Sequence, residues 1–289
     1  MKKCSSNESY QMKNDHIDLE LTDRDIDFLV SAISACGRES SGVRKAIKYD
    51  RDYRKAVVSD RRAFFKITED EDVLLKISPR LYFEVLLRKA QDDLESVSYT
   101  IEKSGNVKIP VFDSQEVTTF LDIPDVLEYL AHMLASFTKI HSYVVPVRIR
   151  KGIKRRVKYS DLDVDSLIKF ASKAEIPDQF KYFKRIGDLC LFLSGIYGTD
   201  MYVQADTDGR NRNNNQWVRK IKRSLEDYEY EGKTFYKLAR EHPTSTLLGL
   251  SDVFQKLGEN FLDARKPLIL LSENYIYRRQ KLLFGARIS

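Results

Sequence analysis

Residues 180–197, FKYFKRIGDLCLFLSGIY, predict the element around which the rest of the chain is arranged. Their apolar side chains fall on nearly every side of a helix rather than on a single stripe. These apolar residues are Ile186, Leu189, Cys190, Leu191, Phe192, Leu193 and Ile196. Because a helix that is apolar all round is buried by its neighbours, we expect a central helix over about residues 178–197, covered on most sides by other helices.

The flanking sequence supplies those neighbouring helices. Thr22 can cap a helix whose first turn holds Asp23 and Asp25, two residues that suit the positive end of the helix dipole. Ser78 followed by Pro79 marks the start of a helix that runs to about residue 97. Apolar residues at helical spacing predict further helices near 41–50, 52–66, 124–141, 162–174, 217–241, 245–264 and 267–284.

Two segments have the alternation of a β-hairpin instead. Residues 98–112 turn at Ser104-Gly105-Asn106, and Pro110 restricts their second strand to an edge or a bulge. Residues 143–159 form the better-defined strand pair. The predicted fold class is therefore mainly α, a multi-helix bundle with one or two small antiparallel β-hairpins.

The register of the 143–159 hairpin follows from its side-chain alternation. A three-residue loop, Arg150-Lys151-Gly152, sets apolar residues opposite apolar residues. The expected pairs are Tyr143 with Tyr159, Val145 with Val157 and Ile149 with Ile153. The opposite face then gathers Arg148, Lys154, Arg156 and Lys158. A two-residue loop, Lys151-Gly152, would set Ile149 against Lys154 and mix the faces, so the three-residue loop is preferred.

Four regions are expected along the chain: a disordered tail over 1–16, an N-terminal helical region with a small hairpin over 17–142, a basic β-hairpin over 143–160, and a C-terminal helical domain over 161–289. The segments 185–197, RIGDLCLFLSGIY, and 232–239, GKTFYKLA, resemble a pattern in a family of uncharacterised prokaryotic helical proteins. The resemblance covers about the last 110 residues. It implies a helical fold and assigns no activity and no catalytic residue.

Basic residues are concentrated in three stretches, 143–160, 210–223 and 276–289. They hold seven, six and four Lys or Arg and no Asp or Glu, whereas the remaining 243 residues hold 32 basic and 43 acidic residues. The formal net charge of +6 therefore describes an acidic body with basic patches. Clustered positive charge attracts polyanions with a salt-dependent affinity. An ordinary solvated basic surface is the competing interpretation.

From this clustering we predict a non-enzymatic protein that binds nucleic acid or another polyanion. The expected contacts on the hairpin are Arg148, Arg150, Lys151, Lys154, Arg156 and Lys158. A second surface is expected from Arg219, Lys220, Lys222 and Arg223. The neighbouring Trp217 either stacks on a base or, as we prefer, packs inward. The alternative function is a protein-interaction or scaffolding subunit whose apolar C-terminal helices pair with a second copy or an adaptor.

Sequence signals for catalysis and for metal binding are weak. Asp161-Leu162-Asp163-Val164-Asp165 opens like a calcium loop, but Ser166 and Ser172 stand where that loop needs Gly and a bidentate Glu. The four histidines lack a metal-binding spacing, and no P-loop, GxGxxG or GxSxG motif occurs. We expect no cofactor and no metal. An enzyme with scattered catalytic residues is the third hypothesis.

Composition indicates the compartment. No apolar run approaches the roughly 20 residues of a membrane span, and the first 16 residues lack the apolar core of a secretion signal. The three cysteines, Cys4, Cys36 and Cys190, are odd in number and widely spaced, so no disulfide framework is indicated. We therefore expect a cytoplasmic protein without a membrane span, in which Cys190 is a buried structural thiol.

Overall fold

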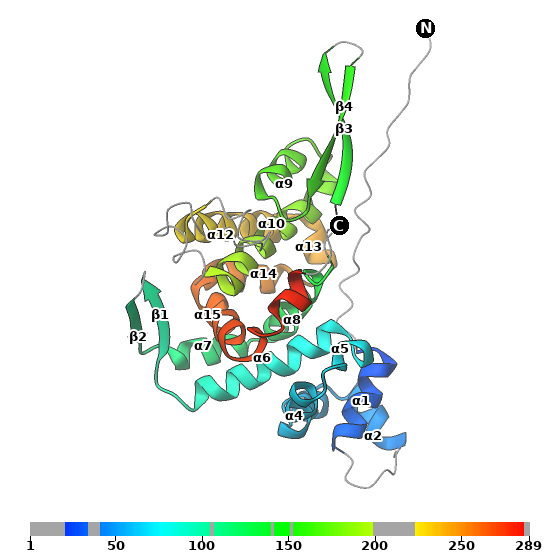
Figure 1. Ribbon diagram of the computed structural model, residues 1–289, viewed down its shortest axis with the longest axis vertical. Coiled ribbons are helices and arrows are strands. Elements are labelled where there is room, and N and C mark those ends of the chain that lie inside the picture. Colours follow the sequence, from blue (N-terminus) through cyan, green and yellow to red (C-terminus); the bar gives the residue numbers. More distant parts are fainter. Residues whose placement is uncertain are drawn as a thin grey trace.

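The computed structural model describes residues 21–33, 41–104, 107–139, 142–150, 153–198 and 223–285, and for the strands around 102–108 and 142–160 it describes the backbone. Figure 1 shows a body of packed helices from which two hairpins extend. Each hairpin is a two-stranded antiparallel sheet. The predicted fold class, mainly α with small hairpins, is confirmed.

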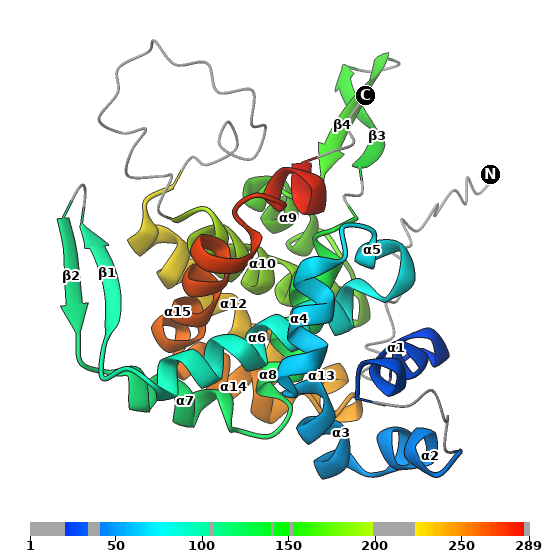
Figure 2. The same ribbon diagram turned by 60° about the horizontal axis from the view of Figure 1, so that its bottom comes forward.

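The N-terminal helices and the first hairpin precede residue 137. The first group comprises α1 (Asp23–Ile33), α2 (Ser41–Tyr49), α3 (Arg51–Val58), α4 (Arg61–Glu69) and α5 (Val73–Lys76). The second group comprises α6 (Pro79–Glu95), β1 (Thr100–Ser104), β2 (Val107–Val111), α7 (Ser114–Leu121) and α8 (Val126–Ser136). Figure 2 shows the long helix α6 running between the N-terminal helices and the base of the β1–β2 hairpin.

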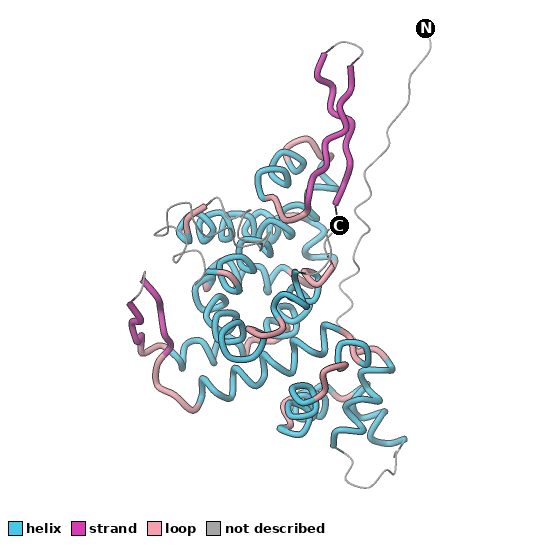
Figure 3. The backbone as a smooth tube through the Cα atoms, viewed as in Figure 1, coloured by secondary structure: helices cyan, strands magenta, loops and turns pink. Residues whose placement is uncertain are grey.

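The second hairpin and the C-terminal helices follow. They comprise β3 (Ser142–Arg150), β4 (Ile153–Ser160), α9 (Val164–Ala171), α10 (Ile176–Ile196), α12 (Leu225–Glu241), α13 (Pro243–Leu247), α14 (Ser251–Glu259) and α15 (Phe261–Leu271), with π-helical stretches η2 (Ser272–Ile276) and η3 (Lys281–Gly285). Figure 3 shows how the two strand pairs stand apart from the helices.

The predicted helix starts are confirmed by their caps. At α1, the Asp25 backbone N–H donates to Thr22 Oγ1 at 3.2 Å, and the Asp25 carboxylate accepts from the Thr22 N–H at 3.0 Å. At α6, the Leu81 N–H donates to Ser78 Oγ at 3.1 Å. Each cap satisfies an amide that the helix itself leaves without a partner.

Other predicted boundaries were wrong because local turns interrupt the apolar pattern. The helix expected over 52–66 is two helices, and Asp60 starts the second by accepting from the Arg62 N–H at 2.8 Å. The helix expected over 245–264 is divided among α13, α14 and α15, with breaks at Gly249, whose φ of 67° is left-handed, and at Asn260. Within the described residues, the helix expected over 217–241 begins at Leu225, after the Ser224 cap.

The central position predicted for residues 178–197 is confirmed. Helix α10 packs against α9, α12 and α15, and its residues from Ile186 to Ile196 are all buried. Burial raises the pKa of the Cys190 thiol well above its usual range, so this residue stays protonated within the core. The structure thus places Cys190 as a structural thiol.

Asp188 is a carboxylate buried in the middle of this apolar helix. Its Oδ1 accepts hydrogen bonds from the Tyr129 and Tyr236 hydroxyls at 2.6 and 3.0 Å, and its Oδ2 lies 2.8 Å from Lys184 Nζ. Burial, with the Asp188 charge, raises the pKa of both tyrosines well above their usual range, so both remain donors at neutral pH. The network satisfies a charge whose burial alone would be costly.

The expected boundary between an N-terminal region and a C-terminal domain does not divide the core. One buried apolar cluster runs from Ile26 in α1 to Phe284 in η3. Tyr129 of α8 also reaches Asp188 of α10 across the 143–160 hairpin in sequence. Within the described residues the helices of both regions therefore share a single core, and the hairpin is an excursion from it.

Glycines allow the closest helix contacts around α10. A Cβ at Gly187 would overlap the Tyr236 ring, and one at Gly232 of α12 would overlap the Phe261 ring of α15. A Cβ at Gly258 would instead meet its neighbours at 3.7 Å, an ordinary van der Waals distance.

We predict that Gly232→Ala lowers the free energy of unfolding by about 1–3 kcal/mol, because the added methyl group must displace a packed ring. The measurement is urea unfolding followed by circular dichroism. Gly258→Ala is the matched control, and it should leave stability unchanged or raise it by about 0.5–1 kcal/mol, since alanine favours a helix interior. Equal effects of the two substitutions would contradict the role assigned to Gly232.

Candidate functional site

The basic hairpin β3–β4 projects from the helical body beside α9 (Figure 1). Its antiparallel register pairs Ser142 with Ser160, Tyr143 with Tyr159, Val144 with Lys158, Val145 with Val157, Pro146 with Arg156, Val147 with Arg155 and Arg148 with Lys154. The predicted pairs of Tyr143 and Val145 are confirmed. So is the predicted opposition of Arg148 and Lys154.

The end of the hairpin differs from the prediction. Ile149 does not pair with Ile153, because the register shifts between Arg148 and Arg150 and pairs Arg150 with Ile153. A bulge of this kind inserts one extra residue into one strand. Pairing therefore continues to Arg150, and only residues 151 and 152 separate the strands. The preferred three-residue loop was wrong, yet the bulge preserves the expected register below it.

This register concentrates basic positions on both strands. Positions 148, 154, 156 and 158 alternate with the Tyr143–Tyr159 and Val145–Val157 pairs, as the two faces of a strand pair require. Arg148 and Lys154 are direct cross-strand neighbours. Like charges directly opposite each other destabilise a strand pair by a few tenths of a kcal/mol, and a bound anion would remove that cost.

Ion pairs to the helices hold the segment that follows the hairpin. Asp161 Oδ2 lies 2.6 Å from Arg185 Nη2 of α10. The Arg185 guanidinium also lies 3.9 Å from the centre of the Phe137 ring and donates to Ser136 Oγ at 2.9 Å. The strand end at Ser160 is thus followed at once by a residue anchored to α10.

The second predicted basic surface loses one residue. Arg223 lies 2.6 Å from Asp165 Oδ1 and 2.8 Å from Glu231 Oε2, and only 16% of its side chain is exposed. Hydrogen bonds and charge from both carboxylates raise the pKa of Arg223 against the opposing effect of burial. Its charge is therefore compensated within the protein. Lys151, Trp217, Arg219, Lys220 and Lys222 lie outside the described residues.

The third basic stretch contributes a structural arginine. Arg279 donates to the backbone carbonyls of Ile67, Thr68 and Asp70 at 3.3–3.4 Å. These carbonyls lie at the C-terminal end of α4, where the negative end of the helix dipole favours a positive charge. Arg279 therefore fastens the C-terminal segment to α4.

The described residues contain no group of three or more His, Cys, Asp or Glu side chains that could hold a metal ion. The aspartates of 161–165 diverge, since Asp161 pairs with Arg185, Asp165 pairs with Arg223 and Asp163 accepts from Ser166 Oγ at 2.6 Å. Over the same ranges, no helix is long and apolar enough to cross a membrane.

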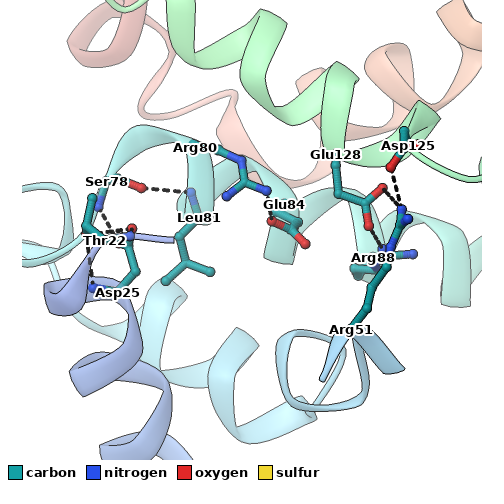
Figure 4. Close-up of polar contacts among 10 residues, drawn as sticks. All are labelled: Thr22, Asp25, Arg51, Ser78, Arg80, Leu81, Glu84, Arg88, Asp125 and Glu128. Atoms are coloured by element: carbon teal, nitrogen blue, oxygen red, sulfur yellow. Dashed lines mark hydrogen bonds and ion pairs between the residues drawn. The ribbon is translucent and has the colours of Figure 1, made fainter. Parts of the chain in front are cut away.

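Sequence reasoning missed a buried charged seam along α6 (Figure 4). Arg80, Glu84 and Arg88 are only 7%, 2% and 3% exposed. Arg80 Nη2 lies 3.2 Å from Glu84 Oε2, and Arg88 Nη2 donates to Glu128 Oε1 of α8 at 2.9 Å. Their spacing of four places them on one helix face. From sequence that face resembles a solvated one, and only the packing of α3 and α8 over it reveals the burial.

Helix α3 adds ion pairs to acidic residues at and before the start of α8. Arg51 Nη2 donates to Asp125 Oδ1 at 2.7 Å and lies 3.7 Å from Glu128 Oε2. Lys55 Nζ lies 3.1 Å from Asp122 Oδ1. In the described structure Arg80 Nε and Nη1 and Arg88 Nε have no hydrogen-bond partner. The seam therefore joins α3, α6 and α8 by charge in addition to the apolar core that these three helices share.

Glu84 should make stability depend on pH. Burial raises its pKa above the usual 4.5, and Glu128 adds to the rise. Arg80, Arg88 and Arg54 act in the opposite direction without cancelling it. The folded state then holds this proton more tightly than the unfolded state. The contribution of Glu84 to the free energy of unfolding is fully present at pH values below its usual pKa. It is lost as pH rises through the raised pKa of the folded state.

We predict that Glu84→Gln removes this loss. The free energy of unfolding of the variant relative to wild type should rise as pH increases from about 4.5, by about 1.4 kcal/mol for each unit of pKa elevation. Urea unfolding at a series of pH values measures the difference. Glu95→Gln changes an exposed residue of the same helix and should follow wild type. A Glu84→Gln difference that does not vary with pH would refute the assignment.

Comparisons with protein-family models, with curated proteins and with solved structures give no match. The resemblance of 185–197 and 232–239 to uncharacterised prokaryotic helical proteins therefore stays an expectation. A function for this chain has to be argued from its own residues, and the projecting basic hairpin is the feature that offers the most specific chemistry.

Proposed function

We propose that this protein binds nucleic acid through the hairpin β3–β4. The observation that carries the proposal is the register that sets Arg148 directly opposite Lys154 on a hairpin extending from the helical body. The stretch 143–160 holds seven Lys or Arg and no Asp or Glu. The opposed pair costs a few tenths of a kcal/mol, and an anionic partner would remove that cost.

The dimensions of the hairpin suit a duplex groove. Strands rise about 3.3 Å per residue, so the nine residues of β3 extend roughly 30 Å. The major groove of B-DNA is about 12 Å wide and admits a two-stranded β-ribbon. Basic positions on both strands can then contact phosphates on both sides of the groove.

The scaffolding alternative has less support in the fold. The apolar residues that suggested it include Phe254, Leu257, Phe261, Leu268 and Leu271, which are buried in the core of this chain. These five residues are therefore occupied by intramolecular packing, whereas Leu238 and Leu282 of the C-terminal helices are 36% and 62% exposed. We further propose a cytoplasmic location, where Cys190 would remain the thiol that the structure shows.

The test is a fluorescence-anisotropy titration of a labelled duplex at low and at higher salt. We expect binding at low salt with an affinity that falls as salt increases. The quadruple variant Arg148→Ala, Lys154→Ala, Arg156→Ala, Lys158→Ala should bind more weakly. Its slope of log affinity against log salt should shrink by about 0.9 for each phosphate that the variant no longer neutralises.

The matched control removes four positive charges elsewhere. Lys45, Lys173, Lys237 and Arg240 are exposed residues of the helical body. Their quadruple alanine variant has the same net charge as the hairpin variant and should retain most of the affinity and the salt slope. Absence of binding by wild type at low salt, or equal losses in the two variants, would rule out the hairpin as the binding element.

A further inference from the structure

A second surface of this protein has the chemistry of a base-stacking platform. It is one face of the β1–β2 hairpin, which lies on a different side of the helical body from β3–β4 in both ribbon views (Figures 1 and 2). We propose that this face binds single-stranded nucleic acid, with aromatic rings stacking on bases and lysines near the tip facing phosphates. This inference extends the proposed function and concerns a separate set of residues.

The register defines the face. β1 and β2 pair Ile101 with Pro110 and Lys103 with Lys108. Directly opposed residues lie on the same side of a strand pair, and Tyr99 and Phe112 continue this row at the base. Their ring centres are 6.2 Å apart in an edge contact. The row thus runs from an aromatic pair through an apolar pair to a pair of lysine positions at the tip.

The aromatic and apolar members of the row are open to solvent. Phe112 is 76% exposed, and Tyr99 and Ile101 are 42% and 43% exposed. By contrast, Thr100 on the other face is 6% exposed and donates to the Asp113 carboxylate. The other face is covered only at its base, since Ile109 of that face is 45% exposed, and the exposed Tyr99–Phe112 pair is what distinguishes the aromatic face.

Contacts at the base of the hairpin attach it to the helical body. Asp113 forms an ion pair with Lys266 of α15, and Ser114 Oγ donates to the Val97 carbonyl at 2.6 Å. These contacts attach both ends of the hairpin to α7 and α15. A rigid base lowers the entropic cost of presenting rings to a ligand.

The residues of this face favour single-stranded nucleic acid as the ligand. The row of six positions contains two lysines, at 103 and 108, and no carboxylate, because Glu102 pairs with Ile109 on the opposite face. Pro110 has no N–H to offer a further strand, which disfavours a protein partner that adds to that edge. Exposed aromatic rings on the same surface as basic positions are the features that proteins use to hold single strands with little sequence preference.

The experiment uses the full chain and a fluorescein-labelled oligothymidine. Tyr99→Ala with Phe112→Ala should weaken its binding about 5- to 150-fold for each base that no longer stacks on a ring, and should leave duplex binding through β3–β4 unchanged. Lys103→Ala with Lys108→Ala should lower the salt slope by about 0.7 for each phosphate that the variant no longer neutralises. The control, Tyr49→Ala with Tyr230→Ala, removes two exposed rings elsewhere on the protein, 77% and 74% exposed, and should bind as wild type does.

The outcomes separate this inference from the proposed function. Duplex binding that depends on the β3–β4 arginines and lysines, together with unchanged oligothymidine binding by the Tyr99–Phe112 variant, would overturn the platform and leave the first site standing. Oligothymidine binding that depends on the two rings, without any duplex binding, would support the platform and overturn the proposed duplex site on β3–β4. Light scattering tests the remaining alternative, which is self-association through this face. If removal of the two rings changes the mass of the protein in solution and leaves the oligothymidine affinity unaltered, the face is a self-association surface and the platform is refuted.

Discussion

Helix α10 is buried on all sides, and the surrounding helices pack around it. Gly187 and Gly232 allow aromatic rings to lie against the backbones of α10 and α12. The only charged group in the buried stretch from Ile186 to Ile196 is Asp188, which sits at the meeting point of α8, α10 and α12. An unpaired carboxylate there would oppose folding. Two tyrosines and Lys184 from three different helices satisfy it together, so the network couples segments far apart in sequence.

Charge is used in two ways in this protein. Inside the body, arginines are committed to specific acceptors: Arg88 to Glu128, Arg185 to Asp161, Arg223 to Asp165 and Glu231, and Arg279 to the end of α4. In these positions an arginine joins one helix to another because its planar group can satisfy several acceptors at once. On β3–β4, Arg148 is instead set opposite Lys154, and the other basic positions stand opposite uncharged residues. That difference separates arginines that hold the fold together from those proposed to bind a ligand.

The two hairpins share a design. Each has a pair of like-charged basic positions directly across the strands, Arg148 with Lys154 in one and Lys103 with Lys108 in the other. They differ in the residues beside that pair. β3–β4 has further basic positions and a paired tyrosine row, whereas β1–β2 has exposed aromatic and apolar residues and few charges. The first arrangement suits phosphates along a duplex, and the second suits unpaired bases.

Much of the fold could be predicted because its determinants are local. Capping by Thr22 and Ser78, the apolar pattern of residues 178–197 and the alternation of 143–159 depend only on neighbours in the chain. For the same reason the register of β3–β4 was accessible, apart from the bulge at Ile149, which inserts a residue that alternation does not anticipate. Helix breaks at Asp60 and Gly249 were missed because the apolar pattern continues across them.

The helical class, the central helix, the two hairpins and the segregation of basic residues along the chain can be read from the amino-acid sequence. Which of those charges are compensated, and which apolar residues stay exposed, depends on the folded arrangement of the helices. Arg223 and Arg279 belong to basic stretches of the sequence, but carboxylates and backbone carbonyls compensate them in the folded chain. Phe112 ends a predicted strand, and the fold leaves it 76% exposed. Compensation and burial depend on groups tens to hundreds of residues away, and such contacts exist only after the chain has folded.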